Sequence, residues 1–325
     1  MYVVGLDIGY SNVKTVYGDA GGRPKSAVIP AGAAPAQYTS ETMISKEDDP
    51  TKSMVTVNGK QWVAGVPLNQ IEGWVRDVHD SYPATDTYYA LFLSAISSLG
   101  RGNIDHLVTG LPVFHYRDEE MQESLVNRLK GDHVGLDGKS FHIEEVSVVP
   151  QPVGAYMDLA STFDDQELIE EGRILVIDPG YFSVDWITME GMQARMSSSG
   201  TSLKAMSKLI ESAVKMIEEN HGSGVSVLTI ENALRAGKSR ILHYGNRVDI
   251  TQYLEKAAME NAGFALTALK SSTRENTSAV DIVLLTGGGA NLYRSAAEEA
   301  FPRSRIITPD EPVTSNANGF WFLGI

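Results

Sequence analysis

Two acidic turns of matching sequence are the part of this chain best suited to chemistry. Asp7 and Gly9 mark the first turn, and Asp178 and Gly180 mark the second, 171 residues further along. Neighbouring residues match at the same offset: Tyr10 with Tyr181 and Val13 with Val184. Aspartate and glycine are common in turns, so a plain hairpin explains either one alone. The matched pair instead predicts two related halves, each presenting one acidic turn.

Such a pair of turns is typical of a site for a nucleotide and its metal ion. Glycine lets backbone N–H groups approach phosphate oxygens, and a concavity of such groups binds anions without a basic side chain. Two carboxylates would repel a triphosphate unless Mg²⁺ lay between them, and Mg²⁺ usually keeps several of its waters. We therefore expect Asp7 and Asp178 to face one cleft between two like-built domains and to hold Mg²⁺ through water.

Strand-like sequence surrounds both turns. Residues 3–16 (VVGLDIGYSNVKTV) and 174–187 (ILVIDPGYFSVDWI) each predict a strand, a tight turn and a returning strand. Spacing and turn residues predict the other elements of the first half: a strand over 25–30, a loop-rich insertion over 31–80 with an Asn58-Gly59 hairpin, helices over 88–99 and 121–129, strands over 104–109 and 144–149, and a helix beginning near Pro152.

The second half has the same alternation of strands and helices. Gly200-Thr201-Ser202 is predicted to cap an amphipathic helix that runs to Ile217. The remaining elements are a long helix over 250–269, a buried strand over 280–286 that runs into three glycines, and a helix over 315–325. This alternation in both halves predicts an α/β architecture, with the crossing between domains at residues 150 and 151.

Composition excludes several classes of protein. The chain has 325 residues, 42% of them hydrophobic, which fits two packed domains. A net charge of −14 argues against direct nucleic-acid binding over a broad surface. Neither a membrane span nor a signal peptide is expected. The chain has no cysteine, and its seven histidines lack ligand spacing, so we expect a cytoplasmic protein without a transition-metal site.

Five motifs occur in the order found in the actin, Hsp70 and sugar-kinase superfamily, and resemble its phosphate 1, connect 1, phosphate 2, adenosine and connect 2 motifs. They are Asp7–Lys14, Gln151–Ala155, Asp178–Asp185, Leu284–Ala290 and Asn316–Phe320. Within that superfamily the opening VGLDIGYSNVK, the Gly110-Leu-Pro112 segment and DPGYFSVDW look most like the bacterial actin-like plasmid-segregation proteins of the ParM/StbA type. The chain departs from other branches at Tyr181 and Phe182, where small residues are usual.

The resemblance implies a fold, a domain division and a function. The fold would be the actin-like, ribonuclease-H-like duplicated ATPase fold with a nucleotide cleft between its halves. Domain I would span 1–150, with an insertion over about 31–80, and would be completed by a helix over about 315–325; domain II would span 151–314, with a helical subdomain over about 202–275. The implied activity is ATP- or GTP-dependent filament assembly with slow hydrolysis, and a DNA-binding adaptor protein would link the filaments to plasmid DNA.

Roles for single residues follow from the same resemblance. Asp7 and Asp178 would hold the waters of Mg²⁺, and Gln151 would orient the attacking water. The β- and γ-phosphates would lie against the first turn: Gly9, Tyr10, Ser11, Asn12 and Lys14. Gly180 and Tyr181 would offer backbone N–H groups to the γ-phosphate. The nucleoside would lie against the remaining set, with Gly287, Gly288, Gly289 and Asn291 beneath it and Gly200, Thr201, Lys204 and Lys238 beside the ribose or base.

Simpler interpretations remain open for some of these residues. Lys14 could instead be a solvated lysine at the end of a strand, and Gln151 an exposed polar residue at the start of a helix. Lys204 and Lys238, placed near the base, could equally well be surface charges. Asp185 occupies the position of Lys14 in the second repeat, and we interpret it as structural.

Two other functions also stay open. The first is a kinase for a sugar or another small molecule, which needs a substrate pocket with a catalytic aspartate; many short members carry a cysteine-rich zinc motif that this chain cannot contain. The second is a nucleotide-binding scaffold that does not polymerise. An Hsp70-type chaperone is disfavoured, because no substrate-binding domain follows within 325 residues.

Overall fold

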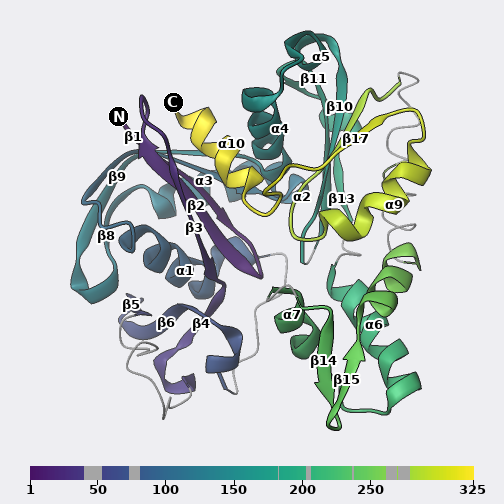
Figure 1. The fold of residues 1–325 in the computed structure, drawn as a ribbon. Coiled ribbons are helices and arrows are strands. Elements are labelled where there is room, and N and C mark those ends of the chain that lie inside the picture. Colours follow the sequence, from purple (N-terminus) through teal and green to yellow (C-terminus); the bar gives the residue numbers. More distant parts are fainter. Residues whose placement is uncertain are drawn as a thin grey trace. The chain divides into compact units, whose positions relative to one another are not determined.

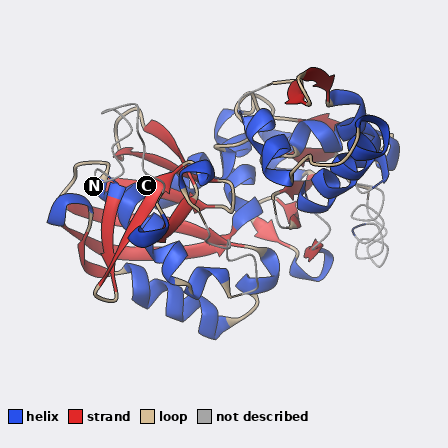
Figure 2. Cartoon of the chain, turned by 90° about the horizontal axis from the view of Figure 1, so that it is seen from below, coloured by secondary structure: helices blue, strands red, loops and turns tan. Residues whose placement is uncertain are grey.

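The computed structural model describes residues 1–39, 53–72, 81–181, 183–202, 206–235, 238–260, 269 and 279–325. The chain divides into two compact units, coloured by sequence in Figure 1. The first unit is Met1–Phe163 with Val313–Ile325, and the second is Asp164–Pro312. Figure 2 shows helices packed against the strands of each unit. Within the described ranges, none of the helices has the length and apolar character needed to cross a bilayer.

A six-stranded sheet forms the centre of the first unit, in the order β3-β2-β1-β7-β9-β8. Its strands are β1 (Tyr2–Ile8), β2 (Asn12–Asp19), β3 (Lys25–Pro30), β7 (Asn103–Leu111), β8 (Gly131–Val134) and β9 (Ser140–Pro150). The helices of this unit are α1 (Asp86–Ser97), α2 (Val113–Tyr116), α3 (Glu119–Leu129), α4 (Gln151–Thr162) and α10 (Ser315–Gly324). Strand β1 runs antiparallel to β2 and parallel to β7.

Alternation along β1 decides which side chains face which helices. Leu6 and Ile8 are buried in the core that also contains residues of α1. Val3 is buried in a separate cluster with Trp321 of α10. Figure 1 shows α10, in yellow, running beside the purple strands β1 and β2. By the same alternation Asp7 lies on the α10 side of the sheet.

A small sheet belongs to the predicted insertion. It contains β4 (Gly32–Pro35), β5 (Met54–Val57) and β6 (Lys60–Val66), in the order β4-β6-β5. Asn58 and Gly59 join β5 to β6 with φ angles of 50° and 73°. Two consecutive positive φ angles are the signature of the tight hairpin turn predicted here. Residues 40–52 and 73–80 of the predicted insertion lie outside the described part of the chain.

The second unit repeats the topology of the first. Its sheet has the order β12-β11-β10-β16-β17, with β13 also paired to β11. The strands are β10 (Arg173–Pro179), β11 (Val184–Glu190), β12 (Gln193–Ala194), β13 (Gly200–Ser202), β16 (Ile282–Leu285) and β17 (Arg305–Ile307). Strand β10 is antiparallel to β11 and parallel to β16, as β1 is to β2 and β7. The sequence repeat is therefore also a repeat of strand connections.

Helices and one hairpin complete the second unit. They are α5 (Gln166–Glu171), α6 (Met206–His221), α7 (Val227–Arg235), a helical stretch over 251–260, α9 (Ala290–Ala300) and the hairpin of β14 (Arg240–His243) and β15 (Asn246–Asp249). The predicted helix over 250–269 matches the stretch over 251–260, and its residues 261–268 lie outside the described residues.

Two assignments differ from the sequence prediction. Helix α4, predicted to open the second domain, belongs to the first unit because it packs against α10. The backbones meet at two glycines, where a Cβ on Gly319 would overlap the carbonyl oxygen of Gly154. Gly200–Ser202 was predicted as a helix cap but pairs with β11 as strand β13. A strand partner distant in sequence outweighed the local capping preference.

Candidate functional site

The first acidic turn joins β1 to β2. The N–H of Gly9 donates to the carbonyl oxygen of Asn12 at 3.1 Å and closes the turn. Asp7, only 3% exposed, lies at the end of β1 opposite Lys14 of β2. The Lys14 Nζ is 2.9 Å from the Asp7 Oδ2, so the buried carboxylate has a charged partner. Buried charged side chains in proteins are usually paired in this way.

Gln151 engages the other oxygen of the same carboxylate. It is the first residue of α4, with Pro152 beside it in the first helical turn, where a missing N–H is tolerated. Its Nε2 donates to the Asp7 Oδ1 at 3.1 Å. Gly110, near the end of β7, makes room for this arrangement, because a Cβ there would lie 2.8 Å from the Gln151 Cγ. Three elements thus converge on Asp7.

The second acidic turn has the same internal bond. The N–H of Gly180 donates to the carbonyl oxygen of Ser183 at 2.8 Å, which is the counterpart of the bond from Gly9. Asp178 is 8% exposed. A Cβ on Gly287 would overlap the Asp178 Oδ1, and Gly287 has a φ of 73°. Only glycine suits this position, so the carboxylate lies directly against the backbone of the glycine loop.

The glycine loop after β16 is fixed at both ends. The N–H of Gly287 donates to the carbonyl oxygen of Pro312 at 2.8 Å, and that of Gly289 to the carbonyl oxygen of Pro179 at 3.0 Å. Gly288 is exposed, and a Cβ there would meet no atom within 4 Å. Helix α9 begins directly afterwards at Ala290. An exposed glycine at the start of a helix leaves its backbone open to a ligand.

The donor chemistry of the two aspartates fits Mg²⁺, which prefers carboxylate oxygens. Across the described ranges no group of three or more His, Cys, Asp or Glu side chains could hold a metal ion. Asp7 lies in the first unit and Asp178 in the second. Each could offer carboxylate oxygens to an ion that keeps several of its waters.

Two family models match the chain. One describes the N-terminal domain of actin-like proteins and matches residues 5–154; the other describes the C-terminal domain of an archaeal, MreB-like actin homologue and matches residues 176–299. This chain belongs to the actin-like proteins. The family and fold predicted from the five motifs are therefore confirmed. A search of curated protein sequences finds no match.

Solved structures share the actin-like fold. An archaeal actin homologue superimposes with a TM-score of 0.78 at 22% identity over 99% of both chains. A complex of that homologue with ADP gives 0.75 at 20% identity, again over 99% of both chains. A ParM filament from Clostridium botulinum gives 0.75 at 17% identity, over 99% of this chain and 98% of that one. At these identities the likeness concerns the fold.

Asp185 of this actin-like protein has a structural environment. It lies opposite Asp178 on β11, as Lys14 lies opposite Asp7 on β2. Its carboxylate accepts hydrogen bonds from the hydroxyls of Ser183 and Thr201. These bonds tie the second turn to β13. The hydroxyl proton of Thr201, predicted to lie beside ribose or base, is thereby used within the protein.

The other residues predicted to contact the nucleotide lie in separate parts of the chain. The N–H of Gly180, predicted to face the γ-phosphate, is used in closing its own turn. Lys238 is exposed in the segment after α7, where its N–H donates to the carbonyl oxygen of Ala233. Lys204 lies outside the described residues. Asn291 is exposed in the first turn of α9, next to the glycine loop.

Two residues near Asp7 were not predicted as part of the site. Gly110 was noted only as part of the Gly-Leu-Pro resemblance, although a glycine at the end of a strand signals close backbone approach. Tyr82 stacks on Tyr10 of the first turn, with ring centroids 4.3 Å apart. A tyrosine so distant in sequence carries no local signal of that contact.

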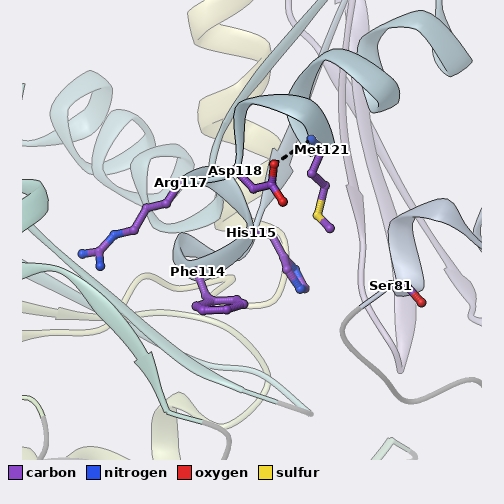
Figure 3. A pocket seen from close by; sticks show the side chains of 6 residues that line it. All are labelled: Ser81, Phe114, His115, Arg117, Asp118 and Met121. Atoms are coloured by element: carbon purple, nitrogen blue, oxygen red, sulfur yellow. Dashed lines mark hydrogen bonds between the residues drawn. The ribbon is translucent and has the colours of Figure 1, made fainter.

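A cavity of about 370 Å³ lies elsewhere in the first unit (Figure 3). It is lined by side chains from α2, α3 and the segments beside them: Ser81, Phe114, His115, Arg117, Asp118 and Met121. Asp118 is already used as the cap of α3, where it accepts from the N–H of Met121. None of the residues predicted to bind nucleotide lines this cavity, so it is not the predicted site.

Proposed function

We propose that this actin-like protein binds ATP or GTP with Mg²⁺ at its two acidic turns, assembles into filaments and hydrolyses the nucleotide within them. The observation that carries the proposal is the pair of matched turns, each with a buried aspartate and a glycine-closed bend, in an actin-like fold. The ADP complex of the archaeal homologue and the filament of the botulinum ParM support the nucleotide and the assembly.

We assign each residue of the proposed site one role in binding or hydrolysing the nucleotide. Asp7 and Asp178 would hold Mg²⁺, which when bound would neutralise charge on the phosphates. Lys14 supplies positive charge beside the first turn, where phosphoryl charge develops. Gln151 orients the attacking water by position, since a neutral amide is a poor base. The glycine loop with Asn291 lies beneath the nucleoside.

We further propose that the filaments move or segregate plasmid DNA through a DNA-binding adaptor protein. The fold likeness to ParM supports this cargo. The formal charge of −14 supports an adaptor, because a strongly acidic chain does not attract phosphate backbones.

Phosphate release and light scattering, recorded together with Mg²⁺ and ATP or GTP, test the proposed activity. Nucleotide-dependent scattering followed by phosphate release supports it. ADP release that requires an added sugar would replace it with a kinase, and binding without scattering or release would replace it with a scaffold. Asp178→Asn should abolish release because it removes a metal-binding charge while keeping the side-chain shape. Asp164→Asn, an exposed aspartate before α5, should behave as wild type.

A further inference from the structure

The first acidic turn is held by an aromatic stack. The ring of Tyr10 lies on the ring of Tyr82, with centroids 4.3 Å apart and an interplanar angle of 23°. Tyr82 in turn meets the edge of the Tyr88 ring at 5.6 Å. Both geometries are those that aromatic pairs prefer. A column of three rings therefore runs from helix α1 to the turn predicted to meet the phosphates.

Tyr82 is a rigid base for this column. It is 4% exposed and lies in the short helical turn directly before α1. The Thr85 hydroxyl donates to its carbonyl oxygen at 2.8 Å and accepts from the N–H of Tyr88 at 3.2 Å, which makes Thr85 the cap of α1. The backbone that follows Tyr82 is thus fixed by the start of a buried helix.

A second contact holds the turn from the other side. The N–H of Ala31, which follows β3, donates to the carbonyl oxygen of Ser11 at 3.1 Å. With the ring stack and the bond between Gly9 and Asn12, three independent interactions fix a turn of four residues. Such a turn has little conformational freedom left to lose when it binds a ligand.

The repeat supplies independent support. Tyr181 occupies the position of Tyr10 in the second turn, and it also packs inward, against the core of the second unit. Its carbonyl oxygen accepts from the N–H of Ser207 at 2.9 Å. A tyrosine after the glycine therefore anchors each turn to its own unit, which explains why bulky residues are accommodated at Tyr181.

We infer that Tyr82 is a positioning residue, which orders the first turn for phosphate through its stack on Tyr10. This inference rests on the proposed nucleotide function. Without the stack, the backbone of the first turn should be mobile. Nucleotide binding would then have to order the turn, which lowers the affinity. The expected loss of affinity is about 3- to 10-fold, the range for one aromatic pair.

Binding of a slowly hydrolysed ATP analogue with Mg²⁺, measured by calorimetry on the full chain, tests the inference. Tyr82→Leu and Tyr10→Leu should each weaken binding by that factor, and the double variant should be no weaker than either one. Tyr82→Phe keeps the ring and should bind as wild type. Tyr17→Leu, a half-buried tyrosine of β2 outside the turn, is the matched control. Additive losses, or a loss in Tyr82→Phe equal to that in Tyr82→Leu, would overturn the role.

Hydrogen exchange of the nucleotide-free protein supplies a readout that does not depend on function. The leucine variants should exchange faster at residues 9–12 alone, whereas faster exchange across the whole unit would mean a general packing role and would overturn the inference. Unchanged exchange at 9–12 would also overturn it. Tyr10→Leu keeps the test decisive if the buried Tyr82 variant does not fold. Wild-type protein that binds no nucleotide would refute the proposed function, and the exchange result would still decide whether the stack orders the turn.

Discussion

Each oxygen of the Asp7 carboxylate accepts one hydrogen bond, and this determines which end of the Gln151 amide points toward it. A carboxylate oxygen can only accept, so the amide of Gln151 must present its NH₂ group to Asp7. The amide oxygen is then the atom left to accept a hydrogen bond from water, and within the described residues no donor reaches it. Lys14 donates to the other oxygen of Asp7, so Lys14 and Gln151 do not compete for the same atom.

Gln151→Ala should slow hydrolysis much more than it weakens binding. Loss of a positioned water is expected to lower the single-turnover rate by about 100-fold, whereas the dissociation constant should change little. Filaments should consequently last longer. Single-turnover kinetics and calorimetry on the same preparation measure the two effects, with the exposed Gln61→Ala as control. A loss of affinity in proportion to the rate would identify Gln151 as a binding residue instead.

His133 should make the stability of the first unit sensitive to acid. It is 5% exposed and packs against the rings of Phe92 and Phe141, and burial lowers its pKa. An unfolded histidine takes up a proton near pH 6.5, whereas the folded one resists protonation. The free energy of unfolding should therefore fall as the pH drops below about 6.5.

Denaturant unfolding at pH 7 and pH 5 tests whether the free energy of unfolding falls in acid. His133→Phe should reduce the loss of stability between the two pH values. His142 is the opposite case, because its hydrogen bond to Asp132 raises its pKa, so it stabilises the folded state in acid. His142→Gln should make the acid loss steeper. Equal pH dependence in all three proteins would refute the assignment.

At the scale of elements, the backbone of helix α10 comes into direct contact with the backbones of β1 and α4 at glycines. A Cβ on Gly5 would overlap the carbonyl oxygen of Ala317, and one on Gly319 would overlap that of Gly154. Since Gln151 begins α4 and Asp7 is the last residue but one of β1, this close packing sets the distance between them. The helix that closes the chain is therefore part of the frame of the site.

Gly319→Ala should destabilise the first unit by at least about 1–3 kcal/mol, the usual range for overpacking, because backbone atoms cannot rotate away. Gly102→Ala is the control, since a Cβ there meets nothing within 4 Å. Thermal unfolding of both variants measures the difference. Equal stability would show that α10 does not pack as described.

Two neighbouring glycines of the loop after β16 should differ in how much an alanine substitution destabilises the protein. Gly287→Ala meets a left-handed backbone, which costs about 1–2 kcal/mol, and displaces Asp178 as well. Gly288→Ala meets open space and should keep wild-type stability. The midpoint temperature of thermal unfolding should fall for the first variant only. Equal effects of the two substitutions would contradict the contact between Gly287 and Asp178.

The hairpins were predictable because their signals are local. Runs of β-branched residues, a glycine turn and a repeat at a constant offset predicted both acidic turns, and Asn58-Gly59 predicted its own hairpin. Contacts between distant segments carry no such signal. The pairing of Gly200–Ser202 with β11 and the placement of α4 beside α10 depend on packing partners far along the chain. The stack of Tyr82 on Tyr10 belongs to the same class.

At the scale of the whole molecule, both units contain an acidic turn of the same design. A strand ends at a buried aspartate, a glycine closes the turn, and a tyrosine anchors it to the core of its own unit. The two halves differ at one position, where Lys14 faces the first aspartate and Asp185 faces the second. The lysine of the first unit forms an ion pair with its aspartate, whereas the extra carboxylate of the second unit accepts hydrogen bonds that connect its turn to β13.

Electron microscopy of the purified protein, with Mg²⁺ and a slowly hydrolysed ATP analogue and again without nucleotide, tests the central claim most directly. We predict that the wild-type protein forms filaments with the analogue and stays dispersed without it. We predict no filaments from Asp178→Asn under either condition. Filaments that form equally well without nucleotide, or that Asp178→Asn forms as readily as wild type, would contradict the account.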